Sequence, residues 1–193
     1  MKAAYAVALL LPLAGCEIES DKTPDPLEAA PMRWDFHPDG ADWTQASLVA
    51  LSEHGQPLST IVPADIDTWC PAYPEAGRAQ RDAFWTGLLS TLAKHESTWN
   101  PQAVGGDGRW FGLVQISPGT ARGYGCDARS GDALKDGPAN LSCAIRIMAV
   151  TVPRDGVVSA GQQGVAADWG PFWSDRKRAD MIAWTREQPY CTG

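Results

Sequence analysis

The chain has 193 residues, of which 44% are hydrophobic, so it is long enough for one domain of ordinary size with a hydrophobic core. Lys and Arg number 16 against 23 Asp and Glu, which gives a net charge of -7, and no basic run occurs. Because this charge would repel the phosphates of a nucleic acid, we exclude a nucleic-acid partner.

The first sixteen residues, MKAAYAVALLLPLAGC, have the pattern of an export signal. Their apolar stretch is too short for a membrane span of about 20 residues, and small residues follow it. The end of this stretch, Leu-Ala-Gly-Cys16, resembles the bacterial lipobox, after which the cysteine is lipidated. We therefore expect a lipoprotein signal peptide at residues 1–15 and a domain anchored through Cys16 on the periplasmic side of a bacterial membrane, with the outer membrane favoured. An ordinary signal peptide with an incidental cysteine is the alternative.

Four further cysteines remain, Cys70, Cys126, Cys143 and Cys191. An even number suits an oxidising compartment, and four cysteines allow three pairings. We favour the nested pairing Cys70–Cys191 and Cys126–Cys143, because the second pair brackets a loop and the first flanks the domain. The cysteines show no CxxC spacing and the three histidines are scattered, so we expect no metal site, and we expect no cofactor.

Residues 16–40 contain many prolines and acidic residues without a sustained period, which is typical of a tether. A short helical pattern follows at residues 44–55, and residues 57–74 are expected to form an irregular connection. We expect this N-terminal extension, residues 41–76, to pack on the main domain.

Residues 77–193 are expected to form the main domain. Its first helix is predicted at about residues 77–97, from apolar residues at helical spacing. A second helix is predicted to begin near Ser117-Pro118, and two more are predicted at residues 136–152 and 174–188. No repeated alternating strand pattern occurs, so the sequence predicts a mainly α domain.

Glu96 falls at the C-terminal end of the first predicted helix, just before the helix-breaking Asn100-Pro101. A carboxyl there meets the negative end of the helix dipole, and apolar walls would dry it, so both effects would raise its pKa. Such a carboxyl can hold a proton near neutral pH and deliver it to a glycosidic oxygen. From this segment alone, a solvated glutamate beside a turn is the alternative.

Two segments together carry a family resemblance: HESTWNP, which contains Glu96, and FGLVQISPGTA, which follows a Gly-rich stretch. They resemble the two leading motifs of bacterial lytic transglycosylases of the soluble-lytic-transglycosylase (SLT) type, Glu-Ser-x-x-Asn-Pro and Gly-Leu-(Met)-Gln-(Ile/Leu)-x-Pro-x-Thr-Ala. The resemblance covers about residues 84–172. It implies a lysozyme-like helical fold of the goose type with a substrate cleft.

By this resemblance, Glu96 corresponds to the single catalytic glutamate, and Ser97 to the serine that positions substrate and carboxyl. Gln115 corresponds to the glutamine that lines the sugar cleft, and Gly112 would let the backbone approach the glycan closely. The helix that begins at Asn140 is expected to be structural or to support the cleft.

The chain departs from the family pattern near its end, where AADWGPF stands in place of Ala-Tyr-Asn-(Ala/Gly)-Gly. Ala167 replaces the tyrosine and Asp168 replaces the asparagine. We expect Asp168 to remain a substrate contact and Tyr124 or Trp169 to take over from the missing phenol; reduced activity is the alternative.

Nine tryptophans are a high count, and an indole ring either fills a core or stacks against a flat ligand such as a sugar. We expect one or two of the five that lie near the motifs to line the sugar cleft. These five are Trp85, Trp99, Trp110, Trp169 and Trp173. His95 has no partner motif for nucleophilic chemistry and is expected to serve packing or helix-end charge.

The implied reaction cleaves the β-1,4 bond between N-acetylmuramic acid and N-acetylglucosamine in peptidoglycan without water, leaving a 1,6-anhydro end. Glu96 would protonate the leaving oxygen and then accept a proton from the C6 hydroxyl. A hydrolytic muramidase would need a second carboxylate, for which Asp107 and Asp168 are the nearby candidates. A catalytically weak glycan-binding or scaffold protein is the other alternative. We expect a monomer whose partners are glycan strands and the membrane.

Overall fold

The structure is a computed structural model that describes Met1 and residues 30–192. The expected signal peptide, Cys16 and the first part of the expected tether lie outside the described residues. The elements run in the order α1 (Gly40–Ser52), α2 (Gln56–Thr60), α3 (Ile66–Trp69), η1 (Tyr73–Glu75), α4 (Arg78–Ser97), β1 (Val104–Gly105), β2 (Trp110–Phe111), α5 (Pro118–Gly123), η2 (Ala133–Lys135), α6 (Gly137–Asp155), η3 (Ala160–Gln162), η4 (Gly164–Ala167), η5 (Gly170–Trp173), α7 (Asp175–Arg186) and α8 (Pro189–Thr192). None of the helices in this part of the chain is long and apolar enough to cross a membrane.

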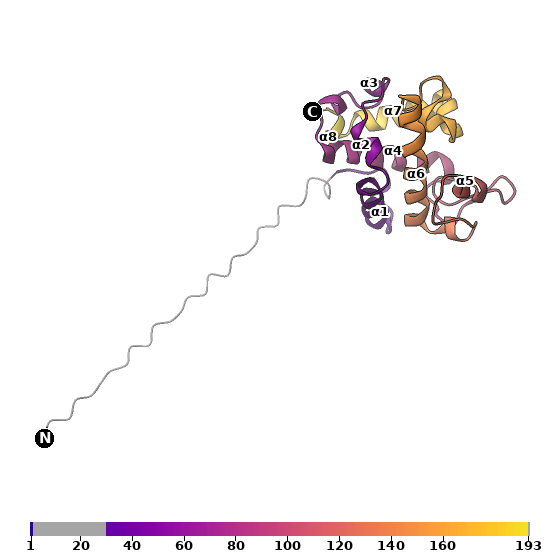
Figure 1. Ribbon diagram of the computed structural model, residues 1–193, viewed down its shortest axis with the longest axis horizontal. Helices are drawn as coiled ribbons and strands as arrows, with labels where there is room; N and C mark the ends of the chain where they lie inside the picture. Colours follow the sequence, from indigo (N-terminus) through magenta and orange to yellow (C-terminus); the bar gives the residue numbers. More distant parts are fainter. Residues whose placement is uncertain (2–29, 193) are drawn as a thin grey trace.

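Helix α4 lies in the interior of the fold, with α1, α2, α7 and α8 packed against it (Figure 1). Every residue from Asp82 to Ala93 is buried, so this stretch has no solvent face. A helix buried all round does not need a strict apolar stripe, and its polar residues must find partners inside the protein. Thr86 and Ser90 do so by donating hydrogen bonds to backbone carbonyls one turn earlier. The central helix therefore provides a fixed support for its C-terminal residues.

The predicted helices at residues 77–97, 136–152 and 174–188 correspond to α4, α6 and α7. The helix expected near Ser117 is α5, and the Ser117 hydroxyl accepts the Thr120 N–H at 3.0 Å as its N-cap. The segment expected to be irregular, residues 57–74, instead contains α3 and most of α2. These helices have only four and five residues, too few to show a helical period.

The expected tether does not extend to residue 40, because the segment before α1 is packed on the domain. Met32 and Trp34 are buried, and the Trp34 indole donates to the Thr44 hydroxyl at 2.9 Å. The guanidinium of Arg33 forms two hydrogen bonds, of 2.6 and 3.0 Å, with Asp180 in α7. Any tether must therefore end by about residue 30.

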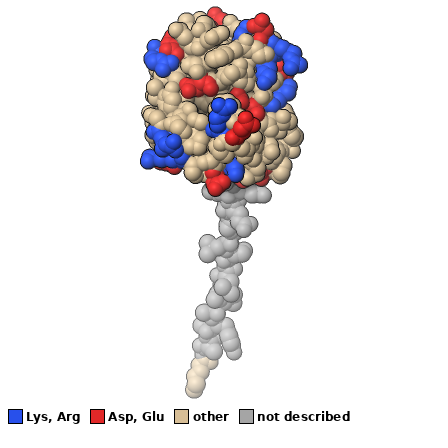
Figure 2. All heavy atoms as spheres, turned by 90° about the vertical axis from the view of Figure 1, so that its right-hand side faces the viewer, with Lys and Arg blue, Asp and Glu red and all other residues tan. Residues whose placement is uncertain are grey.

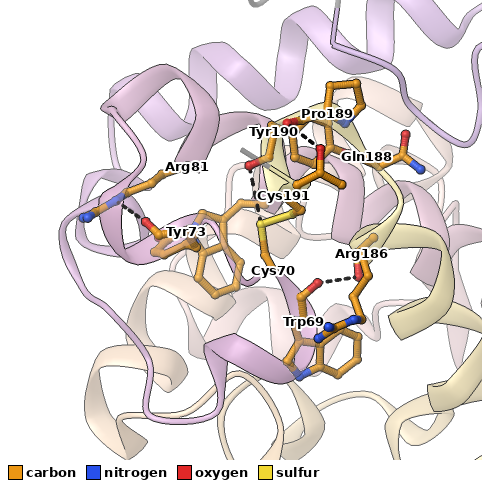
Figure 3. Close-up of a disulfide and its surroundings, with 12 residues drawn as sticks. Trp69, Cys70, Tyr73, Arg81, Arg186, Gln188, Pro189, Tyr190 and Cys191 are labelled. Atoms are coloured by element: carbon orange, nitrogen blue, oxygen red, sulfur yellow. Dashed lines mark hydrogen bonds between the residues drawn. A yellow bond between two sulfur atoms is a disulfide. The ribbon is translucent and has the colours of Figure 1, made fainter.

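The structure contains the two disulfides Cys70–Cys191 and Cys126–Cys143, which is the nested pairing that we favoured. Figure 3 shows the first of these, which joins the chain just after Trp69 to the C-terminal helix that carries Tyr190. The second joins the segment after α5 to α6. Each bond is expected to stabilise the fold by about 2–4 kcal/mol, chiefly by restricting the unfolded chain.

A small antiparallel hairpin follows α4, with Val104 paired to Phe111 and Gly105 paired to Trp110. This hairpin contains the Gly-rich stretch of the sequence, for which no strands were predicted. Gly106, Asp107 and Gly108 in the turn all have positive φ, between 54° and 86°. Two-residue strands are too short to show an alternating pattern, so they could not be predicted from the sequence.

Candidate active site

Glu96 lies in the last turn of α4, whose end is set by two residues in the left-handed region. Thr98 has φ 54° and Trp99 has φ 58°, and their N–H groups donate to the carbonyls of Lys94 and Ala93. The Trp99 indole also folds back and donates to the Ser90 carbonyl at 2.9 Å. The helix thus ends directly after Ser97, before the Asn-Pro pair, and the chain turns away from the Glu96 side chain.

The Glu96 side chain lines a cavity of about 510 Å³, which is of the size of a ligand site. The other residues that line this cavity come from β2, from the loop before α5, from the segment between η4 and α7, and from α7 itself. They are Trp110, Gln115, Asp168, Trp169, Gly170, Pro171, Trp173 and Lys177. A smaller cavity of about 40 Å³ shares four of these residues and extends toward Ser117 and Thr120. The fold therefore brings residues from positions 96 to 177 to one site.

Burial raises the pKa of Glu96 from its usual value of 4.5 to about 7, and the nearby charge of Lys177 opposes this rise. The position at the C-terminal end of α4 disfavours the anion further, because the free carbonyls there carry partial negative charge. A carboxyl of this kind is partly protonated at neutral pH and can both donate and accept a proton.

Gln115 reaches the cavity from a strained loop that is fixed by its own side chain. Its φ is 51°, in the left-handed region, and its amide nitrogen donates to the carbonyls of Ala103 and Gly112 at 3.2 and 2.9 Å. The bond to Ala103 ties the loop to the segment just before the hairpin, and the bond to Gly112 closes the loop on itself. The wall of the cavity around Gln115 is therefore held by these hydrogen bonds and by the buried side chains of Leu113 and Val114 beside it.

Asn140, in the first turn of α6, supports the same loop from behind. Its side chain is fully buried, accepts the Val114 N–H at 3.0 Å and donates to the carbonyls of Phe111 and Leu134 at 3.0 and 2.9 Å. All the strong hydrogen-bonding positions of the amide except one are used. This agrees with the expectation that the helix beginning at Asn140 supports the cleft.

Ser97 and Gly112 do not line the cavity, so the structure gives them different surroundings from those expected. The Ser97 hydroxyl donates to the Leu113 carbonyl at 2.8 Å and is also within hydrogen-bond distance of the Ala93 carbonyl, which joins α4 to the Gln115 loop. Gly112 has φ 82°, and a side chain there would collide with the Leu134 carbonyl and Asn140. Glycine is required because protein atoms, rather than a glycan, approach this backbone.

The family tyrosine is missing on one side of the site, which is formed by Trp169, Asp168 and Tyr124. Trp169 is only 3% exposed, and its indole N–H is used by the Val114 carbonyl, so it forms wall and cannot donate to a ligand. The Tyr124 hydroxyl donates to Asp168 at 3.2 Å but does not itself line the cavity. Ala167 is exposed and also does not line it. Of the two candidates to replace the phenol, Trp169 reaches the site directly and Tyr124 reaches it through Asp168.

Five residues that line the cavity were not among the sequence-predicted contacts: Trp110, Gly170, Pro171, Trp173 and Lys177. Trp173 is 55% exposed, and its indole N–H donates to the Ala166 carbonyl at 2.7 Å, which fixes the ring at the cavity rim. From the sequence, Trp173 is only one of five tryptophans of which one or two are expected to line the sugar cleft. Lys177 lies in the first turns of α7, and nothing in the sequence relates it to a glutamate 81 positions earlier. Only the packing of α7 on α4 brings the two together.

Trp110, in β2, is a second exposed tryptophan that lines the cavity, with 43% of its surface exposed. The Arg109 guanidinium lies 4.9 Å from the centre of its ring, which supports the ring from one side. Trp85 and Trp99 instead use their indole N–H groups on interior carbonyls and serve packing.

The remaining candidates lie away from the cavity. His95 contacts Asp180 at 2.7 Å, in a cluster with Arg33 and Lys94, and burial lowers its pKa, which favours the packing role over a helix-end charge. Asp107 is exposed in the hairpin turn and does not line the cavity. Asp168 is the only carboxylate besides Glu96 among the lining residues, and desolvation at the cavity wall raises its pKa. Among residues 30–192, no group of three His, Cys, Asp or Glu side chains is placed to hold a metal ion.

The acidic side chains do not gather on the face of the molecule that Figure 2 shows. On the face shown in Figure 2, basic and acidic side chains are interspersed, with uncharged surface between them. The net charge of -7 therefore does not by itself select a substrate of one sign.

Comparison with known proteins gives one family and one group of structures. A family model described as "Transglycosylase SLT domain" matches residues 75–156. Three solved structures of Bd0314 DslA are similar to this chain. They are a Glu-to-Gln mutant (30% identity, covering 85% of this chain and 98% of that chain, TM-score 0.77), wild-type form 2 (29%, 83% and 97%, TM-score 0.75) and a second Glu-to-Gln mutant (28%, 83% and 97%, TM-score 0.74). No protein in a comparison with curated sequences matches the chain.

The match of the family model includes Glu96, Gln115 and Asn140 but ends before the segment from Asp168 to Lys177. One wall of the cavity is thus built from family motifs, and the opposite wall lies beyond the segment that the family model matches.

Proposed function

Because the chain belongs to the transglycosylase SLT family, we propose that it is a peptidoglycan lytic transglycosylase with Glu96 as its acid and base. It would cleave the β-1,4 bond between N-acetylmuramic acid and N-acetylglucosamine without water. The observation that carries this proposal is the desolvated carboxyl of Glu96, with its pKa raised to about 7, at the wall of a cavity of ligand size.

In the first step, the protonated Glu96 carboxyl gives its proton to the glycosidic oxygen, and the bond from that oxygen to C1 of the muramic acid breaks. In the second step, the ionised carboxylate takes the proton of the C6 hydroxyl, whose oxygen bonds to C1. The products are a free 4-hydroxyl on the leaving sugar and a 1,6-anhydro ring, and Glu96 is protonated again. A pKa near neutral suits both steps, because one group must donate and then accept. The 2-acetamido group of the substrate would stabilise the charge that develops at C1 between the two steps.

The glycan would contact the exposed indoles of Trp110 and Trp173 at the rim of the cavity. Each ring is held in one orientation by the protein, and a rigid aromatic face suits the apolar face of a sugar ring. Gln115 and Asp168 would supply polar contacts from the cavity wall. The site thus offers the mixture of aromatic and polar groups that an oligosaccharide requires.

A hydrolytic muramidase is the second candidate, and two observations favour it. Asp168 lines the same cavity as Glu96. In addition, the two Glu-to-Gln mutants of DslA replace residues eleven positions apart, and Asp107 follows Glu96 by the same interval. Either aspartate could activate water as a base. A glycan-binding protein with weak activity is the third candidate, favoured by the alanine at position 167.

The mass of the muropeptides released from purified peptidoglycan separates these three candidates. A lytic transglycosylase releases products that are lighter than the hydrolytic products by one water molecule and that lack a reducing end. Full-mass reducing products would instead establish the muramidase. Binding without any released product would establish the glycan-binding protein.

We also propose that the chain is exported and lipid-anchored at Cys16, facing the periplasm. The support is the sequence pattern of residues 1–16 and the two disulfides, which form in oxidising compartments. Radiolabelled fatty acid should be incorporated into the wild-type chain in cells and not into Cys16→Ala. Equal incorporation into both, or none into either, would contradict lipidation at this residue.

A further inference from the structure

Lys177 is the only basic residue among those that line the Glu96 cavity. The other two lysines in residues 30–192 are both neutralised: Lys94 forms an ion pair with Asp180 at 3.0 Å, and Lys135 forms one with Asp132 at 3.0 Å. Lys177 forms no ion pair with any described residue, and its ammonium has one hydrogen bond, of 3.4 Å, to the His95 carbonyl. An ammonium has three donors, so two remain available at the cavity.

Lys177 makes one hydrogen bond through its backbone and one through its ammonium. Its backbone N–H caps α7 by donating to the Ser174 hydroxyl, and its side chain donates to the carbonyl of the residue that precedes Glu96. One turn further along α7, Asp180 binds His95 and Lys94 and so fixes α7 against the end of α4. The part of α7 that carries Lys177 is therefore fixed against the end of α4, and its ammonium lies at the cavity that Glu96 lines.

The charge of Lys177 works against Glu96 in the empty site. It lowers the pKa of Glu96, whereas the first step of the proposed reaction needs that carboxyl protonated. Half-burying an unpaired ammonium also costs free energy. Both costs would be offset if an anionic group of the substrate bound the ammonium of Lys177. That group would neutralise the charge of Lys177 and let the proton stay on Glu96.

We propose that Lys177 is a substrate-binding residue that receives a carboxylate carried by the glycan next to the bond that is cleaved. This inference rests on the proposed function and names the feature of peptidoglycan that the site selects. Peptidoglycan can supply the carboxylate in two ways. Muramic acid carries a lactyl carboxylate where the stem peptide has been removed, and the stem peptide carries its own carboxylates where it is present.

The test measures oligosaccharide binding to the full-length chain in detergent. Every chain compared carries Glu96→Gln, so that no ligand is cleaved. Three oligosaccharides of equal length are compared: a stem-free glycan with free lactyl carboxylates, a stem-bearing glycan whose lactyl groups are amides, and a neutral chito-oligosaccharide. Lys177→Met is expected to weaken binding of a carboxylate-bearing glycan by about tenfold and to leave the chito-oligosaccharide within about twofold. The weakening should be smaller at high salt, because the lost interaction is between charges.

The two carboxylate-bearing ligands identify the source. A loss confined to the stem-free glycan assigns the lactyl carboxylate, and a loss on the stem-bearing glycan assigns the peptide. Lys135→Met is the matched control, since Lys135 lies outside the cavity, and it should leave all three affinities unchanged. Lys177→Arg should restore most of the affinity because it keeps the charge, and Lys177→Gln replaces Lys177→Met if that variant does not fold.

An equal loss for all three oligosaccharides, or no loss for any, would overturn the role of Lys177 while leaving the proposed function intact. If none of the three binds to the Glu96→Gln chain, the proposed function itself fails, so the two failures are distinguishable.

Discussion

Replacing Glu96 by glutamine is expected to stabilise the protein at high pH while removing its activity. The rise of its pKa from 4.5 to about 7 corresponds to about 3 kcal/mol, at about 1.4 kcal/mol for each pKa unit. Below pH 4.5 the carboxyl is protonated in both the folded and the unfolded chain, so it contributes nothing to the pH dependence. Between pH 4.5 and 7 only the unfolded chain loses the proton, and the penalty on folding grows. Above pH 7 the full penalty is present.

The assay is urea unfolding of the wild-type chain and of Glu96→Gln at pH 4 and pH 8, with the disulfides intact. The difference in free energy of unfolding between the two chains should change by about 3 kcal/mol from pH 4 to pH 8, with the variant favoured at pH 8. Glu53→Gln, at an exposed glutamate far from the cavity, is the matched control and should stay within about 0.5 kcal/mol of wild type. A stability difference that is independent of pH would show that Glu96 titrates as an ordinary carboxyl, and the argument from burial would be wrong.

Three further predictions concern the proton of Glu96, the support of the Gln115 loop by Asn140, and the indole of Trp173 at the cavity rim. The value of kcat/KM for glycan cleavage should fall tenfold for each pH unit above about pH 7, because Glu96 must be protonated to donate; a rate that stays constant from pH 6 to pH 9 would contradict this assignment. Asn140→Ala should lower the free energy of unfolding by about 3 kcal/mol in denaturant titrations, because Val114, Phe111 and Leu134 lose their buried hydrogen-bond partner. The control is Asn100→Ala, at an exposed asparagine, which should lower the free energy of unfolding by less than about 0.5 kcal/mol. Trp173→Ala should weaken glycan binding about tenfold in calorimetry with little change in stability, and Phe36→Ala, which removes an exposed ring outside the cavity, should leave binding unchanged; equal effects would remove the case for stacking at Trp173.

The parts of the site that the sequence predicted well are those set by short-range chemistry. The end of α4 near Glu96 follows from the helical spacing before it and the Asn-Pro after it, and the start of α5 follows from Ser117. The direction of the pKa of Glu96 could also be argued, because a helix end and apolar neighbours both act locally. The favoured pairing of the four cysteines followed from their positions, because Cys70 and Cys191 flank the domain and Cys126 and Cys143 bracket a loop.

The features of the fold and the site that the sequence did not predict depend on contacts between segments that are distant in the chain. Residues 30–39 have the composition of a tether, yet Trp34 is fully buried, because one indole can supply enough apolar area to dock a segment that has no periodicity. The role expected for Gly112 was a close approach of the glycan, whereas the collision is with Asn140, 28 residues away. Lys177 and Trp173 join the cavity only because α7 packs on α4, and no local pattern encodes that contact.

The central claim is that Glu96 performs the chemistry, and the most direct test is the rate of muropeptide release by Glu96→Gln. Glutamine keeps the shape of the side chain and cannot exchange a proton, so the rate should fall by at least about 10²–10⁴-fold, with glycan binding retained. Asp168→Asn and Asp107→Asn, measured beside it, should keep most of the activity if water is not the attacking group. A Glu96→Gln chain that still releases muropeptides at a rate near that of the wild type would contradict the account.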